Sequence, residues 1–492
     1  MKNTKSSNQW VVDSGQLKHK QGTPHDHYPL STAHCPLSTV HCPHMPKVFI
    51  LSLGCPKNLT DAEVMAGHLA EAGFKLTADE TKADVVLINT CAFLSSAVKE
   101  SEAEINRFIS LKKRGKISKI AVTGCLAERE KGLLLRRFPQ IDAVVGINAL
   151  DRIGSALSGE MNYILPDTSP LTAPRLKVRL TAPHTAYLKI ADGCDNRCSY
   201  CAIPLIRGPF RSKPLEQVVE EARDLAASGA REISLIAQDT TSYGMDLYGR
   251  PRLYELLRAL VKLNGVDWIR LMYVYPEKLS LKIVKLMRDE EKICHYLDMP
   301  LQHISDRVLK NMNRRSTGKS IRAKIASVRE LVPDIAFRTN FITGFPGETE
   351  RDFKELNAFV AETGFDNVGV FSYSREPGTP AAGLPGQVPE KVKTARMNEL
   401  ITVQSRIIDK KNRGLIGKTV KVLMDSGNFG RTYRDAPEID GRVEVTGHRT
   451  KAQVTSHLSP VTSWKNPKRP QAGELADVKI TSALGYLRRG TI

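Results

Sequence analysis

Two features of membrane and secreted proteins are missing from this 492-residue sequence. It has no uninterrupted run of about eighteen apolar residues, which a membrane-spanning helix needs. Its N-terminus lacks the apolar segment of a secretory signal peptide. We therefore expect a cytoplasmic protein without a membrane partner.

Cysteine and acidic residues are also in short supply. The nine cysteines are an odd number in a long chain, which favours reduced thiols with ligand roles over a disulfide framework. Only 53 Asp and Glu residues stand against 72 Lys and Arg residues, so the formal net charge is +19. This excess favours an acidic partner such as RNA or a ribonucleoprotein. The alternative is a basic surface that faces only solvent.

The chain is too long for one ordinary core, and its pattern changes along its length. Residues 1–45 are polar, rich in His, Pro and Ser, and without periodicity, so we expect a disordered extension. Residues 46–160 alternate short apolar runs such as ADVVLIN with amphipathic helical patterns. This alternation predicts an α/β domain with a doubly wound parallel sheet.

The remainder of the chain predicts two further domains. Strand and helix patterns alternate again over residues 180–413, where the strand-like run ICHYLDM contains Cys294. We expect Cys294 to be a core residue. Residues 414–490 alternate apolar and polar residues between glycine turns, which predicts a small antiparallel β-barrel.

Three cysteines fall close together in the segment ADGCDNRCSYCAIP. Cys194, Cys198 and Cys201, the triplet cysteines, have the spacing C-x3-C-x2-C. A tetrahedral zinc site needs a fourth Cys or His nearby, which this segment lacks. A four-iron cluster normally takes four cysteines, so three would leave one iron open to a ligand from outside the protein. The spacing therefore predicts an iron-sulfur cluster.

Three more cysteines share one kind of position in the first α/β domain. Cys55 in GCPKN, Cys91 in NTCAF and Cys125 in GCLAE, the strand-end cysteines, each follow a strand-like run. The carboxyl ends of parallel strands share one edge of a sheet, so these residues are expected to converge into a second site with one open position. Three independently buried thiols are the alternative, because cysteine packs well as a small hydrophobe.

The segments LGCPKN, NTCAF, GCLAE and ADGCDNRCSYCAIP, in this order, resemble the methylthiotransferases, a family of radical S-adenosylmethionine (SAM) enzymes. The resemblance extends from about Pro46 to the C-terminus. It implies two [4Fe-4S] clusters: one on the triplet cysteines that binds SAM, and an auxiliary one on the strand-end cysteines that holds sulfide or polysulfide. It also implies a partial (β/α)6 radical SAM barrel for the central domain and a TRAM domain for the terminal barrel.

The implied reaction acts on an unactivated C–H bond, which no general base of ordinary pKa can deprotonate at neutral pH. Cofactors carry such radical chemistry while the protein positions them. By resemblance, one SAM methylates sulfur on the auxiliary cluster, and a second SAM yields the radical that abstracts hydrogen from the substrate. An electron donor is implied as a partner.

Three further residues are candidates for contacting SAM. Tyr200 directly precedes the last triplet cysteine, and Gln238 and Gly344 follow strand-like runs of the central domain. In α/β barrels the catalytic loops lie at the carboxyl ends of the strands. Ordinary barrel turns are the alternative for Gln238 and Gly344. Beyond the cluster ligands, no catalytic residue is predicted.

The family contains tRNA adenosine methylthiotransferases and a branch that modifies the β-carbon of an aspartate in a small-subunit ribosomal protein, the twelfth, at the decoding centre. The strings GCPKN, QDTTSYG and RDAPEIDG look like the ribosomal branch. The last contains Asp435, Glu438 and Asp440. We expect this acidic loop to repel RNA and to attract a segment rich in Lys and Arg.

The expected substrate is therefore this ribosomal protein, within the ribosome or an assembly intermediate, with basic faces elsewhere contacting ribosomal RNA. A tRNA adenosine methylthiotransferase is the first alternative, because the net charge of +19 also suits tRNA. A non-catalytic, ribosome-bound iron-sulfur scaffold or sensor is the second.

Overall fold

The computed structural model describes residues 10–13, 16–19, 45–159, 163–164, 177–446 and 470–492. The chain forms two compact units: residues 1–182 with 202–209, and residues 183–201 with 210–492. The predicted division into four parts stays a prediction, since the central and terminal parts group in one unit. Among the described residues, no helix is long and apolar enough to cross a membrane.

The first unit is built on a mostly parallel sheet. Its parallel strands are β3 (Lys47–Ser52), β4 (Lys75–Thr77), β5 (Val85–Thr90), β6 (Lys119–Gly124), β7 (Ala143–Val145) and β8 (Tyr163–Ile164). They lie in the order β4-β3-β5-β6-β7-β8. This is the doubly wound order 2-1-3-4-5 with one strand added, so the predicted sheet is confirmed.

Two long helices, four short ones and one hairpin accompany this sheet in the described part of the first unit. The helices are α1 (Pro56–Glu71), α2 (Ser95–Lys113), α3 (Cys125–Glu130), α4 (Leu133–Arg137), α5 (Ile153–Ser158) and α6 (Ile203–Arg207). Strands β1 (Trp10–Asp13) and β2 (Gln16–His19) form a hairpin, and β1 pairs antiparallel with β3. The disordered extension expected over residues 1–45 stays a prediction: the structure describes these two strands and Met45 there, and residues 1–9, 14–15 and 20–44 lie outside the described residues.

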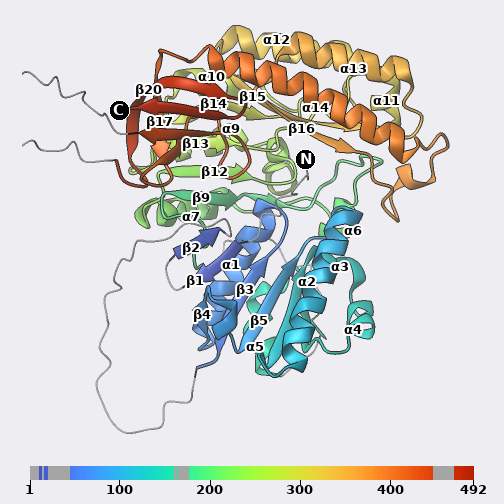
Figure 1. The fold of residues 1–492 in the computed structure, drawn as a ribbon, viewed down its shortest axis with the longest axis vertical. Coiled ribbons are helices and arrows are strands. Elements are labelled where there is room, and N and C mark those ends of the chain that lie inside the picture. The colour runs from blue at the N-terminus through green and yellow to red at the C-terminus, as the bar shows by residue number, and fades with distance from the viewer. Residues whose placement is uncertain (1–9, 14–15, 20–44, 160–162, 165–176, 447–469) are drawn as a thin grey trace, which may run out of the picture. The chain divides into compact units, whose positions relative to one another are not determined.

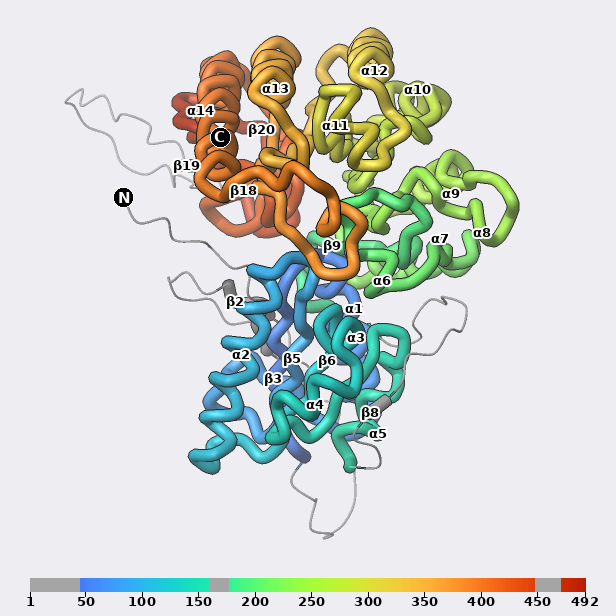
Figure 2. Tube along the Cα trace, turned by 90° about the vertical axis from the view of Figure 1, so that its right-hand side faces the viewer, coloured from blue at the N-terminus to red at the C-terminus, as the bar shows by residue number. Residues whose placement is uncertain are grey.

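The core of the first unit lies between the sheet and its helices. Strand β5 is buried at every position, as expected for a parallel strand covered on both faces. Phe108 of α2 packs against Phe49 of β3, with ring centroids 6.1 Å apart. Figure 2 shows α2 running alongside β3 and β5. The same core includes Ala202 and Ile206, which flank the start of α6.

The second unit contains a six-stranded, entirely parallel sheet. Its strands follow the chain in the order β9 (Thr185–Lys189), β12 (Glu232–Ile236), β13 (Trp268–Leu271), β14 (Ile293–Asp298), β15 (Ala336–Thr343) and β16 (Asn367–Ser372). The main helices are α7 (Leu215–Ala227), α9 (Leu253–Leu260), α10 (Leu281–Asp289), α12 (Gly318–Leu331), α13 (Glu350–Thr363) and α14 (Glu390–Arg413). Helices α12, α13 and α14 lie side by side in both views (Figures 1 and 2).

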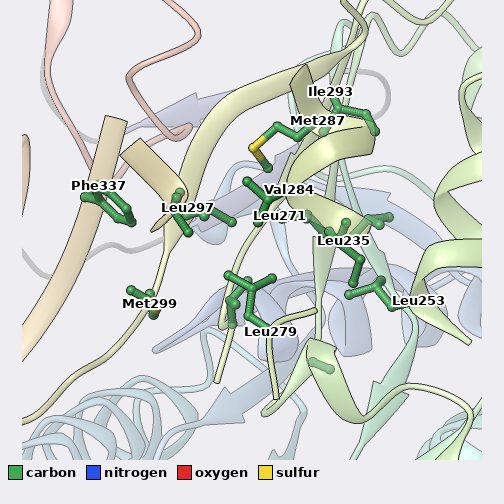
Figure 3. Close-up of a cluster of buried hydrophobic side chains, with 14 of the residues drawn as sticks. Leu235, Leu253, Leu271, Leu279, Val284, Met287, Ile293, Leu297, Met299 and Phe337 are labelled. Carbon is green, nitrogen blue, oxygen red and sulfur yellow. The ribbon is translucent and has the colours of Figure 1, made fainter. Parts of the chain in front are cut away.

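One row of apolar side chains crosses this sheet. Leu188, Leu235, Leu271, Leu297 and Phe337 are paired in register on five adjacent strands. All five are buried in one cluster with side chains from α9 and α10. Figure 3 labels four of them, Leu235, Leu271, Leu297 and Phe337. Successive residues of a strand face opposite sides of the sheet. The residues directly before and after these five therefore face the other side. The row therefore packs helices α9 and α10 against one face of the sheet of the predicted partial (β/α)6 barrel.

The remaining short elements of the second unit lie near the carboxyl ends of these strands or between them. They are β10 (Ala191–Asp192), β11 (Arg211–Ser212), α8 (Met245–Tyr248) and α11 (Asp306–Asn311). Cys294, expected in the core, is only 2% exposed, so that prediction is confirmed. Burial raises the pKa of its thiol to about 12.

A closed five-stranded barrel ends the chain. Its strands are β17 (Thr419–Met424), β18 (Phe429–Arg431), β19 (Arg442–Thr446), β20 (Leu475–Leu484) and β21 (Leu487–Thr491). The predicted small barrel is confirmed, although the pair β19–β21 that closes it is parallel. Val422, Val443 and Val478 are central to its small apolar interior.

A buried arginine joins the terminal barrel to the parallel sheet within the second unit. Arg431 of β18 donates to Glu232 of β12 at 2.6 Å and to Asp425 at 2.8 Å. The Glu232 side chain is fully buried. Removing one partner of a buried ion pair leaves an uncompensated charge in the interior, which is strongly destabilising.

We therefore expect Arg431→Ala to lower the free energy of unfolding by roughly 3–5 kcal/mol. Urea denaturation of the purified protein measures this loss as a lower midpoint. The matched control is Arg489→Ala in the same barrel, which breaks a solvent-exposed pair with Glu444 and costs about 0–1 kcal/mol. Equal midpoints for the two variants would contradict the prediction.

Candidate functional site

The strand-end cysteines lie at the carboxyl ends of three neighbouring strands. Cys55 caps the start of α1, just beyond β3. The last residues of β5 and β6, Thr90 and Gly124, are paired in register, so Cys91 and Cys125 each follow a paired position. Strands β3, β5 and β6 are adjacent in the sheet. The predicted convergence of these cysteines is what this topology produces.

The three thiols are close enough to influence one another. A Cβ atom built on Gly54, directly before Cys55, would lie 2.8 Å from Cys91 Cβ. Burial, together with the negative charges of Cys125 and Cys55, raises the pKa of Cys91 to about 12. Burial also raises the pKa of Cys125, while Arg207 lowers it.

Asn58 ties the three cysteine loops together. Its side-chain amide donates to the carbonyl oxygens of Leu53 and Thr90, each at 2.9 Å, next to the loops of Cys55 and Cys91. Its Oδ1 accepts from the thiol of Cys125 at 3.6 Å. Asn58 is fully buried in the segment GCPKN, where its role escaped the sequence argument. The sequence shows only a polar residue three positions after Cys55, and its burial is visible in the structure alone.

The donor chemistry at this edge fits a four-iron cluster better than a single metal ion. Within the described residues, no group of three His, Cys, Asp or Glu side chains could hold one metal ion. A zinc ion needs sulfur ligands about 2.3 Å from one centre. In an iron-sulfur cluster each cysteine ligates a different iron, so the sulfurs stand further apart. Three soft thiol donors on adjacent strand ends match that arrangement.

The loop of the triplet cysteines is clamped by neighbouring segments of the second unit. Ser199 donates its hydroxyl to the carbonyl oxygen of Asn311 at 2.7 Å, and its amide to that of Met312 at 3.0 Å. Asn313 donates to the carbonyl oxygen of Arg197 at 2.6 Å. Burial raises the pKa of Cys194 to about 11. Residues 311–313, at and just after the end of α11, therefore hold the triplet loop in place.

Two residues that the sequence argument missed lie beside Cys198. The hydroxyl of Tyr275 lies 3.8 Å from Cys198 Sγ, and burial raises the pKa of this phenol. The guanidinium of Arg314 lies 3.9 Å above the ring of Tyr275. Hydrogen bonds and charges near a ligating sulfur tune the metal centre. Both residues come from distant loops, so no local pattern could reveal them.

The three candidate SAM contacts all lie around this loop. Tyr200 packs in an apolar cluster that includes Phe345, the residue after Gly344. Gln238 donates to Asp192 at 2.8 Å, two residues before Cys194. Gly344 has φ +70°, and a Cβ there would overlap the side chain of Lys393, so only glycine fits. A SAM contact by any of them stays a prediction.

A polar network and a cavity adjoin the triplet loop. Lys278 donates to Asp239 at 2.7 Å and to Asn196 at 2.9 Å. Burial alone would raise the pKa of Asp239. The charge of Lys278 and the hydrogen bonds that Asp239 accepts from Lys278, Thr241 and Asn196 outweigh burial, so this pKa is lowered. A cavity of about 280 Å³ is lined by Asp195, Asn196, Phe210, Asp239, Ser242, Met245, Asp246 and Lys278. It offers polar space directly beside the cysteines.

The expectation of an acidic, partner-attracting loop over Asp435, Glu438 and Asp440 is wrong for two of the three carboxylates. The Asp435 side chain is buried and lies 2.7 Å from Arg488. Asp440 accepts from Tyr296 at 2.7 Å and from Arg338 at 3.2 Å. Asp435 is thus paired within the terminal barrel, by Arg488 of β21, and Asp440 is held by Tyr296 of β14 and Arg338 of β15 in the parallel sheet.

Comparisons with known families agree with this architecture in all three parts. Residues 47–146 match Uncharacterized protein family UPF0004, residues 188–360 match the Radical SAM superfamily, and residues 416–487 match the TRAM domain. The protein is thus a radical SAM protein, a class that uses an iron-sulfur cluster and SAM.

Curated relatives define the family within this class. A ribosomal protein uS12 methylthiotransferase RimO from Elusimicrobium minutum is 51% identical over 448 residues, covering 91% of this chain and 100% of the relative. The proteins of the same name from Geobacter sulfurreducens and Lachnoclostridium phytofermentans are 47% and 43% identical, over 81% and 90% of this chain and 92% and 99% of their own. The chain belongs to the RimO family of methylthiotransferases, which are SAM-dependent transferases.

A solved structure shares the fold at low sequence identity. The radical SAM methyltransferase TsrM from Kitasatospora setae, with tryptophan and a SAM analogue bound, has a TM-score of 0.50 and 15% identity. The alignment covers 73% of this chain and 88% of TsrM. This likeness concerns the fold alone.

We expect Gly124→Ala to disrupt the site of the strand-end cysteines. Gly124 has φ 89° and ψ −161°, a conformation that essentially only glycine adopts. An added Cβ would overlap the side chain of Asn89 and the carbonyl oxygen of Thr90, beside Cys91. Iron analysis after anaerobic reconstitution should show the loss of up to half of the iron.

Gly132→Ala is the control for this substitution, because a Cβ at Gly132 meets nothing within 4 Å. It should load as much iron as the unmodified protein. Full loading of Gly124→Ala would show that the loop geometry around Cys91 and Cys125 is not needed for the cluster.

Proposed function

We propose that this chain transfers a methylthio group to the β-carbon of an aspartate in ribosomal protein uS12. The observation that carries the proposal is the convergence of Cys55, Cys91 and Cys125 on adjacent strand ends, in a chain that also has a radical SAM triplet. One three-cysteine site serves SAM cleavage. A second such site is what sulfur transfer would require in addition. The substrate follows the name of the relatives, RimO.

The residues divide into holding and positioning roles. In the proposal, Cys194, Cys198 and Cys201 hold one [4Fe-4S] cluster, and the strand-end cysteines hold an auxiliary one that carries sulfide or polysulfide. When bound, the clusters and SAM supply the radical chemistry that an unactivated C–H bond demands. The hydroxyl of Tyr275 shares a hydrogen bond of 3.8 Å with Cys198 Sγ, and the hydrogen bond from Ser199 to Asn311 holds the loop in place. Tyr200, Gln238 and Gly344 orient SAM.

Contact with ribosomal RNA is part of the proposal, and a basic groove supports it. A cavity of about 500 Å³ runs along α14 and the terminal barrel within the second unit. Its lining includes Lys410, Lys411, Lys418, Arg434 and Arg488 against the acidic residues Asp366 and Asp435. Lys410 and Lys418 are exposed. Such an excess of cations suits a phosphate backbone.

The proposed setting is the cytoplasm, where the ribosome or an assembly intermediate presents the substrate and a reducing protein supplies electrons. The family does not favour a tRNA adenosine substrate, because the curated relatives carry the ribosomal name. A non-catalytic iron-sulfur sensor is likewise not favoured by membership of a transferase family.

The two-cluster assignment predicts about eight irons per chain, four for each cubane. Replacing the triplet cysteines by alanine should remove half of the iron and all SAM cleavage. Replacing the strand-end cysteines should also remove half of the iron but leave reductive SAM cleavage, measured as 5′-deoxyadenosine. Methylthiolation that survives the second replacement would refute the auxiliary site.

The substrate assignment is checked by mass spectrometry of ribosomal proteins and digested tRNA from cells with and without the gene. We expect loss of the methylthio group from an aspartate of uS12 and unchanged tRNA. Loss of a methylthio-adenosine from tRNA, with uS12 unaffected, would replace the proposed substrate by the tRNA one.

A further inference from the structure

An arginine that the proposed reaction does not use is buried against one of the strand-end cysteines. Arg207 is the last residue of α6 and is 2% exposed. Its Nη2 lies 3.7 Å from Cys125 Sγ. The same nitrogen donates to Asn58 Oδ1 at 2.6 Å and to Asp61 Oδ2 at 3.0 Å. All four residues belong to the first unit.

The surrounding sequence explains why a charged side chain occupies this place. Ala202 and Ile206 pack in the same apolar cluster as Cys125 and Leu126, which fixes α6 against α3. Arg207 follows Ile206 directly, so its side chain is carried to the start of α3. A buried arginine is costly unless it is paired and hydrogen-bonded. Here Asp61 and Asn58 accept hydrogen bonds from the guanidinium, while its Nη2 stays 3.7 Å from Cys125 Sγ.

Arg207 brings a positive charge close to one sulfur ligand of the proposed cluster. Its Nη2 stands 3.7 Å from Cys125 Sγ. Asp61, which accepts from the same nitrogen at 3.0 Å, carries the opposing negative charge. A cluster on three thiolates gains a further negative charge when it is reduced. Charges and hydrogen bonds beside the sulfurs therefore shift its reduction potential.

We infer that Arg207 is a positioning residue of the auxiliary cluster. It fixes Cys125 through Asn58, and its positive charge raises the reduction potential of that cluster. The negative charge of Asp61 lowers the same potential. This inference rests on the proposed function, because it requires a cluster on the strand-end cysteines. It assigns opposite effects to the two halves of one buried ion pair. A purely structural pair would weaken the fold in the same way from either side.

The test uses the full chain with the triplet cysteines replaced by alanine, so that only the auxiliary cluster forms. Its midpoint potential is measured by redox titration monitored by electron paramagnetic resonance. Arg207→Gln should lower the potential, since a positive charge is lost beside Cys125. Asp61→Asn should raise it, since the opposing negative charge is lost. Arg207→Lys, which keeps the charge, should restore most of the potential lost in Arg207→Gln.

Arg137→Gln is the control for net charge. Arg137 lies in the same unit, but it is exposed and pairs with Glu102 and Glu130. This variant should keep the parent potential. Shifts of the same sign in Arg207→Gln and Asp61→Asn, or no shift in either, would overturn the inference.

Two outcomes need separate interpretation. If Arg207→Gln fails to hold a cluster, Asp61→Asn decides, and an unchanged potential there overturns the inference. If the parent with intact strand-end cysteines binds no iron, the auxiliary cluster of the proposed function is refuted, and the inference falls with it. A loaded parent whose potential ignores both substitutions refutes the inference alone.

Discussion

The parallel hydrogen-bond ladder is the constraint on which both cysteine sites depend. In a parallel sheet every strand ends at the same edge, so loops far apart in sequence begin side by side. In the first unit the ladder places Thr90 opposite Gly124, and the two following residues are Cys91 and Cys125. In the second unit the triplet loop follows β9 and β10, while Gly344 follows β15. The ligands lie on loops, but the backbone pairing of rigid strands sets their spacing.

Most of this arrangement was predictable from the sequence because it rests on local signals. A short apolar run followed by cysteine predicts both a strand and a cysteine just beyond its end, as Cys55 and Cys91 illustrate. Long-range partners left no such signal. Tyr275 approaches Cys198 across 77 positions of sequence, and Arg207 approaches Asn58 across 149. Only the folded chain brings these pairs within reach of each other.

The segment RDAPEIDG shows why local charge is a poor guide to a binding surface. Counting carboxylates in a short string assumes that all of them face solvent. Here Asp435 is compensated by Arg488, and Asp440 by Arg338, a residue 102 positions earlier in the chain. Burial raises the pKa of Asp440. The charge of Asp435 is therefore balanced inside the terminal barrel, and that of Asp440 where the barrel meets the parallel sheet.

The division of the chain between its two units bears on how the protein is synthesised. Residues 202–209 belong to the first unit, although β9 and the triplet cysteines of the second unit precede them in sequence. Ala202 and Ile206 fill part of the first unit's core. Because translation proceeds from the N-terminus, that core stays incomplete until part of the second unit has left the ribosome. The first unit therefore cannot complete its core before residues 183–201 of the second unit have been synthesised, and no single cut in the chain separates the two units.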